Sequence, residues 1–403
     1  MIRFNVASFK GNLLIGIVGR IDIDDCKNFD AKIKEVRNTH PTGKIVLDFR
    51  ELSYICATGI HVLLNLNSSA TLKIVNIIPE VKAILEDAGV LDMFDVSDFI
   101  REIKVKPENL LEQYSNVKIY SVSKNTIVKL YSESTPLEFV INEHRNAHIA
   151  IKSGIPALIV YDVVKSDGCY GFLSELPEAK NIAAIVQASP ISLSRCAMMA
   201  GNLLSFIHSI DEEKIPDEVP DIKVKLLFAA KNLTKYFHDN EIKIILEMIN
   251  AIPDHKKFIH GSFLTRNIFI DNDVAYVSAF GYLMAGNPIF ELGLVYMVNV
   301  LCAPVFSEEM NNLTADQSRQ FWQVFLQSYM GIKAKTRQAQ ILIHAAGLLM
   351  MSLYPAIHEL RPEVTDKIVA LARRDLFPAG ETLIQFLKEA HLETFTKTSS
   401  TAL

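Results

Sequence analysis

The sequence predicts two successive folding units, a small α/β unit and a larger α+β unit that follows it. A chain of 403 residues is too long for one ordinary hydrophobic core, which favours two or three domains. In the first hundred residues strand patterns alternate with helix patterns, whereas later residues show a β-rich stretch and then a long helical one. Apolar residues make up 49% and charged residues 22% of the chain, which is typical of a folded globular protein.

Composition argues against several classes of partner. The net charge is −5 and no Lys/Arg stripe with interleaved aromatic residues is present, so we expect no nucleic-acid partner. The five cysteines are scattered without a C-x-x-C pair, which favours free thiols in a reducing compartment and argues against a zinc site. The apolar runs 292–306 and 341–357 are shorter than a bilayer span and contain polar residues, so we interpret them as buried helices. The N-terminus lacks the pattern of a signal peptide, and we expect a cytoplasmic protein with no membrane partner.

The first unit is predicted to span residues 1–104 and to form a small mixed sheet with helices stacked on it. Strands are expected at 2–7, 12–18, 43–49 and 71–77, with a turn at 10–11 between the first two. Helical spacing of apolar residues predicts helices at 24–38, 58–69 and 79–90, and the last begins with Pro79.

Two segments of this unit resemble a known family. With 20-RIDIDD-25 after the second strand and 46-VLDFRELSYICATGIHVLL-64 in the middle, residues 1–104 resemble a STAS domain of the anti-sigma factor antagonist type. The resemblance implies a loop D-S-[ST]-G before the central helix, whose first Ser is phosphorylated by a partner kinase. A phosphate there adds nearly two negative charges at the positive end of the helix dipole and so changes a docking surface.

The loop of this chain departs from that pattern, because it reads 56-CATG-59. Cys56 replaces the Asp, Ala57 replaces the phosphorylated Ser, and Thr58 and Gly59 match the family. Ala57 has no hydroxyl, so the usual switch cannot operate. We interpret Thr58 as a helix cap, with modification of its hydroxyl as the alternative. We interpret the four residues as the partner-binding surface of a docking module that phosphorylation cannot switch. The alternative is that the unit only stabilises the rest of the chain.

The second unit is expected to begin after a linker at 105–116. A hairpin over 117–131 turns at 124–125, a helix follows at 136–154, and strands follow at 156–167 and 170–176. These elements predict a β-rich N-lobe at 117–178 and a helical C-lobe at 179–392, with wide apolar helix faces at 319–330, 337–353 and 364–388. Residues 393–403 are polar and are expected to form a flexible tail.

A set of short motifs in the second unit resembles the aminoglycoside phosphotransferase and choline kinase branch of the protein kinase-like fold. They are His260-Gly261, Asn267, Phe280-Gly281, 286-GNP-288 and 291-ELG-293, and the resemblance covers about residues 110–390. It implies that Lys129 binds phosphate, that Glu143 pairs with Lys129, that the hinge lies at Glu175-Leu176, and that His260 braces the catalytic loop.

Both carboxylates that the family uses for phosphoryl transfer are replaced. Ser262 occupies the position of the base Asp, and a hydroxyl does not accept a proton near neutral pH. Ala279 occupies the position of the Asp that ligates Mg²⁺, which prefers carboxylate oxygens. Asp271 and Asp273 are interpreted as a turn facing away from the site. We therefore predict no catalytic residue and no metal site, and the chain looks like a pseudokinase.

The segment expected to cover the phosphates, 111–120, contains no glycine. Tyr114 and Asn116 are expected to crowd the site, and Glu112 is expected to repel an anion. The surviving Lys129, Glu143 and Asn267 either hold a nucleotide, such as ATP without magnesium, or have a structural role.

These observations predict a cytoplasmic bacterial signalling protein that acts by binding a protein partner, for example an anti-sigma factor-like kinase or another regulator. Two alternatives stay open. One is an active but divergent small-molecule phosphotransferase with a replacement acid, and the other is a metal-independent nucleotide sensor.

Overall fold

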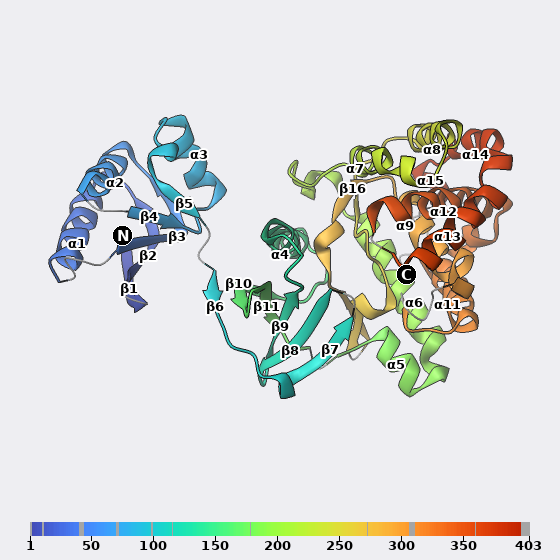
Figure 1. Ribbon diagram of the computed structural model, residues 1–403, viewed down its shortest axis with the longest axis horizontal. Helices are drawn as coiled ribbons and strands as arrows, with labels where there is room; N and C mark the ends of the chain where they lie inside the picture. The colour runs from blue at the N-terminus through green and yellow to red at the C-terminus, as the bar shows by residue number, and fades with distance from the viewer. Residues whose placement is uncertain are drawn as a thin grey trace, which may run out of the picture. The chain divides into compact units, whose positions relative to one another are not determined.

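The chain forms two compact units, Met1–Arg101 and Glu102–Leu403. Figure 1 shows a computed structural model of the chain. The first unit is blue, and the second unit runs from cyan to red. The structure describes residues 2–9, 12–39, 44–69, 72–97, 100–114, 116–177, 179–271, 273–305, 311–358 and 360–395. The expected turn at 10–11 lies outside these residues.

The first unit is built on a five-stranded mixed sheet with the order β1-β2-β3-β4-β5. The first pair is antiparallel and the other three pairs are parallel, which confirms the predicted mixed sheet. The strands are β1 (Arg3–Phe9), β2 (Asn12–Ile21), β3 (Lys44–Ile55), β4 (Leu72–Val75) and β5 (Asp95–Ser97), and the helices are α1 (Cys26–Thr39), α2 (Ala57–Ser69) and α3 (Pro79–Asp87).

One hydrophobic core holds this unit together. Alternate residues of β2 and β3, such as Ile15 and Leu47, are fully buried because side chains of a strand point to opposite faces of the sheet. The helices contribute residues at helical spacing, among them Phe29 of α1, Leu63 of α2 and Leu85 of α3. The same alternation and spacing had predicted these elements.

The N-lobe of the second unit is a six-stranded sheet with the order β6-β10-β11-β9-β8-β7. Its strands are β6 (Arg101–Glu102), β7 (Leu110–Tyr114), β8 (Val117–Ser123), β9 (Thr126–Tyr131), β10 (Val160–Ser166) and β11 (Cys169–Glu175). The long helix α4 (Leu137–Lys152) packs against β10 and β11, and Figure 1 shows it beside the sheet. The hairpin predicted at 117–131 is present with its turn at 124–125.

The structure differs from the expected linker at 105–116. Strand β7 pairs with β8 at one edge of the sheet, and β6 lies at the other edge. The division between the units falls after Arg101 rather than after residue 104. Edge strands have one unpaired side and tolerate polar, exposed residues, so the polar stretch looked like a linker in the sequence.

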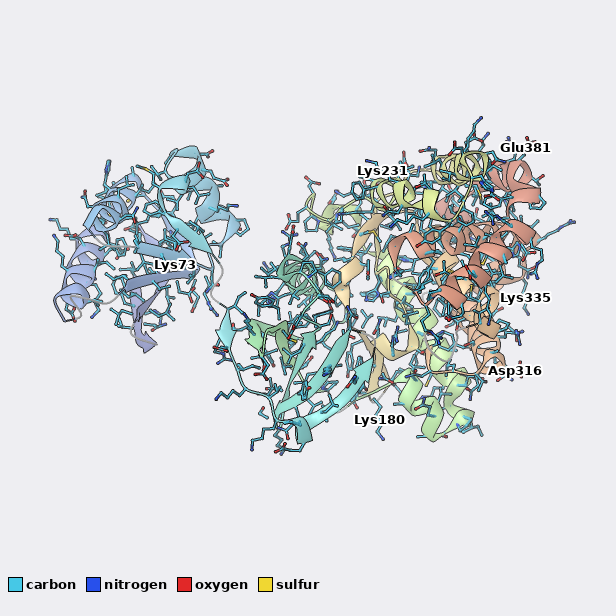
Figure 2. All side chains as sticks on the ribbon, in the orientation of Figure 1. Lys73, Lys180, Lys231, Asp316, Lys335 and Glu381 are labelled. Carbon is cyan, nitrogen blue, oxygen red and sulfur yellow. The ribbon has the colours of Figure 1, made fainter. Side chains whose placement is uncertain are left out.

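The C-lobe is mainly helical. Its helices are α5 (Ile182–Ala188), α6 (Leu193–Ser209), α7 (Ile222–Ala229), α8 (Asp239–Ala251), α9 (Ile289–Tyr296), a π-helical turn (Met297–Leu301), α11 (Ala315–Met330), α12 (Arg337–Ile357), α13 (Pro362–Asp375), α14 (Gly380–Leu387) and α15 (Leu392–Phe395). Its short strands are β12 (Lys180–Asn181), β13 (Lys257–Ile259), β14 (Ile268–Asp271), β15 (Val274–Val277) and β16 (Met284–Gly286). Figure 2 shows side chains filling the space between the helices, with Lys231, Lys335 and Glu381 at the outer surface.

The two apolar runs are core helices, as predicted. Helix α12 is long and apolar enough to cross a membrane, but 72% of its apolar window is buried inside the protein. Helices α9 and α12 approach closely at Gly293, where a Cβ would lie 2.8 Å from the carbonyl oxygen of Ala346. A larger residue at Gly293 would push the two helices apart.

Two expectations for the C-terminal region need correction. The single helix expected at 364–388 is two helices, α13 and α14, because Pro378 lies between them and cannot continue a helix. Residues 393–395, which were expected to belong to the flexible tail, are part of α15, and the side chain of Phe395 is fully buried. Residues 396–403 lie outside the described part of the chain.

Candidate functional site

Lys129 and Glu143 meet inside the N-lobe, as the sequence predicted. Lys129 lies on β9 and its Nζ is 2.7 Å from Oε1 of Glu143 on α4. The side chains are only 14% and 3% exposed. The hydroxyl of Tyr131 donates a hydrogen bond to the other carboxylate oxygen of Glu143. Both oxygens of Glu143 therefore have partners within the protein, and the pair ties helix α4 to the sheet.

The expected catalytic loop is held by Asn267 and His260. The side-chain amide of Asn267 donates to the backbone carbonyl of Ser262 at 2.8 Å and to its hydroxyl at 3.1 Å. Nε2 of His260 lies 2.9 Å from the carbonyl oxygen of Ser278, and Nδ1 accepts from the N–H of Ser262 at 3.3 Å. One ring nitrogen thus donates and the other accepts, which corresponds to a neutral imidazole. Burial lowers the pKa of His260 and maintains this state. His260 therefore braces the loop.

Gly261 has a steric reason to be glycine. Its φ is +74°, in the region that disfavours residues with a Cβ. A Cβ at this position would also clash with the backbone carbonyl oxygen of Tyr282. The His-Gly dipeptide is therefore required by the geometry of the loop.

The sequence did not predict that Glu291 would be the anchor of this loop. Its carboxylate accepts the N–H of His260 at 2.8 Å and the N–H of Gly261 at 2.7 Å. Nε2 of His208 lies 3.2 Å from the same carboxylate, and Nδ1 of His208 lies 2.7 Å from the hydroxyl of Tyr329. Because Glu291, His208 and Tyr329 come from helices α9, α6 and α11, no local signal in the sequence connects them.

The network determines the charge of Glu291. Complete burial alone would raise the pKa of this carboxyl, but the hydrogen bond and nearby charge of His208, with the N–H of His260, lower it below its usual value. Burial raises the pKa of Tyr329, with a further contribution from the charge of Glu291. The loop is therefore fixed by a buried, ionised side chain.

Ala279 keeps an unusual backbone conformation. Its φ and ψ are 68° and 62°, in the left-handed region that residues other than Gly, Asn and Asp rarely adopt. The turn is held by its surroundings, since the side chain of Asn146 on α4 donates to the carbonyl oxygen of Phe280 at 2.9 Å. The backbone therefore adopts this turn although the side chain of Ala279 is only a methyl group.

A cavity of about 60 Å³ lies between the two lobes of the second unit. Lys129, Glu143, Asn267 and Ala279 all contribute to its lining, so the structure brings the predicted residues together. Ser262 and His260 do not line the cavity, but they are hydrogen-bonded to two residues that do, Asn267 and Ser278. The apolar part of the lining includes Ile119, Ile127, Leu158, Val160, Phe172 and Phe269.

Charged residues from both lobes reach the cavity. Glu112 of β7 and Arg266 of the loop both line it. Burial raises the pKa of Glu112, and the positive charge of Arg266 opposes this shift. Asn116 was expected to crowd the cavity, but it lines another hollow with Val105 and Asp167. The side chain of Tyr114 lies outside the described residues.

The backbone N–H groups of the expected hinge, residues 175–177, are already engaged or absent. The N–H of Glu175 donates to the carbonyl oxygen of Ile159 at 2.9 Å, and the N–H of Leu176 donates to that of Asn125 at 2.9 Å. Pro177 has no N–H. Between residues 175 and 177, no backbone donor is left for the edge of a purine base.

The donors around the cavity do not fit Mg²⁺. This ion prefers near-octahedral oxygen ligands that include one or two carboxylates. The inner carboxylate, Glu143, is engaged by Lys129 and Tyr131, and Ser262 and Ala279 supply none. Within the described ranges, no group of three or more His, Cys, Asp or Glu residues could hold a metal ion. Asp271 and Asp273 flank the turn between β14 and β15 and do not line the cavity, and Asp273 pairs with Arg195 at the surface.

In the first unit, the four residues of the α2 loop differ in accessibility. Ala57 and Thr58 are exposed, whereas Cys56 and Gly59 are buried. A Cβ at Gly59 would lie 2.8 Å from side-chain carbons of both Ile21 and Ile55, so this glycine is needed for packing. Thr58 is the second residue of α2 and therefore does not occupy the cap position that we had assigned to it.

Residues 3–103 match the family model described as STAS domain. The first unit is a STAS domain. The resemblance of this unit to a STAS domain is therefore confirmed, whereas the anti-sigma factor antagonist type stays a prediction. The unit makes up about a quarter of the chain. A search of curated proteins found no match.

Similar solved structures include a choline/ethanolamine kinase family protein and aminoglycoside phosphotransferases. A choline/ethanolamine kinase family protein from Mesorhizobium loti shares 13% identity, with 69% of this chain and 92% of that chain covered and a TM-score of 0.47. Aminoglycoside phosphotransferase APH(2")-IIa, solved with streptomycin and ATP, shares 14% identity over 68% and 92% of the two chains, with a TM-score of 0.46. A thermostable mutant of APH(4)-Ia, solved with AMP-PNP and hygromycin B, shares 11% identity over 66% and 93%, with a TM-score of 0.45.

The second unit has a two-lobed kinase-like fold, which follows from its own architecture. An antiparallel sheet with the Lys129–Glu143 pair to α4 precedes a helical lobe with the His260–Asn267 loop. The chain thus joins a STAS domain to a kinase-like domain.

Proposed function

We propose that this protein is a cytoplasmic bacterial regulator that acts by binding a protein partner, and that its kinase-like domain does not transfer phosphate. The proposal rests on the difference between two sets of residues at the cleft: those that hold the backbone of the loop and those expected to carry the chemistry. Gly261, Asn267 and Glu291 keep the loop in place, whereas Ser262 and Ala279 supply neither a base nor a metal ligand.

The polar side chains at the cleft are bonded to one another, which supports a structural role for them. Lys129 is neutralised by Glu143, and the amide of Asn267 is engaged by Ser262. An anion entering the cleft meets the carboxylate of Glu112 as well as the guanidinium of Arg266. A triphosphate would have to compete with these contacts without help from a divalent cation.

The surface of the STAS domain supports docking of a protein. Ala57 and Thr58 are exposed at the start of α2. Cys26 and Cys56 are in contact, which places the loop that precedes α1 beside the start of α2. In that loop Ile23 is 74% exposed between Asp22 and Asp24, both exposed. We name Asp22–Asp24 with Ala57 and Thr58 the switch surface. It suits a partner with an apolar pocket and a basic rim, such as an anti-sigma factor-like kinase or another regulator.

The catalytic part of the proposal is tested by turnover of nucleoside triphosphates with and without Mg²⁺ or Mn²⁺. We expect no phosphate release above background in the wild-type chain. Lys129→Ala is the informative variant, and Lys118→Ala, which removes an exposed lysine of β8, is its matched control. Metal-dependent phosphate release that Lys129→Ala abolishes and Lys118→Ala preserves would favour the divergent phosphotransferase.

The docking part is tested by the affinity for a purified anti-sigma factor-like kinase. Ile23→Arg is expected to weaken binding at least tenfold, because it places a charge at the centre of the switch surface. Ile191→Arg is the control, since Ile191 is 91% exposed in the C-lobe. Equal affinities of both variants and the wild type would contradict docking at the switch surface.

A second candidate function is a metal-independent ligand sensor. The apolar lining of the cleft and the presence of Lys129 in it favour this alternative. A thermal-shift titration with ATP in EDTA distinguishes the two, because a ligand that binds only the folded state raises the unfolding midpoint. A saturable rise that Lys129→Ala removes would support the sensor.

A further inference from the structure

Two buried cysteines meet at the switch surface. Sγ of Cys26, the first residue of α1, lies 3.5 Å from Sγ of Cys56, the residue before α2. The two residues are 5% and 9% exposed. In the part of the chain that the structure describes, no other pair of cysteine sulfurs is in contact.

We propose that Cys26 and Cys56 form an oxidation-sensitive dithiol, which a peroxide converts to a disulfide. The more exposed thiol, Cys56, attacks one peroxide oxygen, the O–O bond breaks, and a sulfenic acid and water form. The sulfur of Cys26 then attacks the sulfenic sulfur, the S–S bond forms, the S–O bond breaks, and a second water leaves. In total, two thiols are oxidised by two electrons, and one peroxide is reduced to two waters.

The geometry is close to that of a disulfide. The S–S bond is about 2.05 Å long, so the sulfurs must approach by roughly 1.5 Å. Cys26 Sγ also lies 3.1 Å from the carbonyl oxygen of Asp22. Cys26 is the first residue of α1, and Cys56 directly precedes α2.

The environment of Cys26 makes it the less suitable of the two thiols for the first attack on the peroxide. Burial, followed by the neighbouring Cys56 and the acidic Asp22 and Asp25, raises the pKa of Cys26 to about 11. Because the thiolate is the nucleophile, Cys26 is slow as the first attacking group at neutral pH, which agrees with the assignment of that step to Cys56.

A disulfide here would act on the switch surface. It would join the loop before α1 covalently to the start of α2 and close a loop of 30 residues. An effect on partner docking rests on the proposed function, whereas the chemistry of the two thiols does not. Oxidation would then take the place of the phosphorylation that Ala57 prevents.

The test is peptide mapping of the full-length chain after treatment with hydrogen peroxide and alkylation of the remaining thiols. We expect a cross-linked peptide pair containing Cys26 and Cys56, lighter by two hydrogens and released by dithiothreitol. Cys26→Ala and Cys56→Ala must abolish it. Cys196→Ala must preserve it, because Cys196 is a buried cysteine of the second unit. Full alkylation of both cysteines after peroxide, or cross-links shared equally with other cysteines, would overturn the proposal.

Thermal unfolding of the wild type provides a second readout that needs no variant of the pair. The closed loop restricts the unfolded STAS domain, so peroxide is expected to raise the midpoint of its transition by about 5–10 °C. The midpoint of the second unit should not change. If the disulfide forms but the affinity for the kinase does not change, the proposed oxidation of the two thiols still holds. Only its proposed effect on docking is then contradicted.

Discussion

The loop before α2 in the STAS domain, which contains Ala57, and the 260–267 loop of the kinase-like domain, which contains Ser262, are held in different ways. The N–H of Cys56 donates to the carbonyl oxygen of Ile21 at 2.9 Å, a bond between backbone groups. The N–H groups of His260 and Gly261 instead donate to the carboxylate of Glu291.

This difference shows which residues each loop depends on for its shape. The STAS loop is fixed by its sheet and by packing at Gly59, so its exposed tip can change at little cost. The kinase-like loop depends on one buried side chain from another helix.

The largest effect is expected for Glu291→Ala. It leaves two buried N–H groups and His208 without their acceptor, so we expect a loss of about 3–5 kcal/mol of unfolding free energy in the second unit. Urea unfolding monitored by Trp322 fluorescence measures this loss, because Trp322 lies in α11. Glu112→Ala, at the rim of the cleft, is the control and should stay within about 0.5 kcal/mol. Similar values for the two variants would show that the loop does not depend on Glu291.

An intermediate effect is expected from acid, which should weaken the kinase-like domain more than the STAS domain. Burial lowers the pKa of His358 to about 4, while the unfolded chain has a value near 6.5. The unfolded state therefore binds more protons in this window, and stability is lost as the pH falls from about 6.5 towards 4. Between pH 7.5 and pH 5 we expect a loss of about 2 kcal/mol from this residue.

Denaturant unfolding of the second unit at the two pH values measures this loss. His358→Phe should reduce it, because the ring packs against Tyr282 and Tyr354 but no longer titrates. His61→Gln is the control, since His61 is exposed on α2. An unchanged pH dependence in His358→Phe would mean that other groups cause it.

The smallest effects are expected in the STAS loop, where Gly59→Ala and Ala57→Ser form a matched pair. The added methyl group of Gly59→Ala meets the ends of Ile21 and Ile55, which can shift, so we expect a loss of about 1–2 kcal/mol. Ala57→Ser adds an exposed hydroxyl and should stay within about 0.5 kcal/mol. Thermal unfolding of the STAS domain compares them, and a larger loss for Ala57→Ser would contradict the assignment of Ala57 to the exposed tip.

Much of the fold was predictable from the sequence because it depends on local patterns. Strand alternation and helical spacing located most elements of the STAS domain, and the short motifs located Lys129, Glu143 and the 260–267 loop. The predictions failed where polar residues form a strand instead of a loop, as in the edge strands β6 and β7. They also failed where a single residue interrupts a pattern, as Pro378 does between α13 and α14.

The sequence by itself determined which chemical groups are missing, since the identities of Ala57, Ser262 and Ala279 do not depend on the fold. Only the tertiary structure decided what holds the remaining groups. Glu291 reaches the loop from a helix 30 residues later, and Cys56 reaches a cysteine 30 residues earlier. Such contacts depend on how helices and strands pack, and spacing along the chain cannot indicate them.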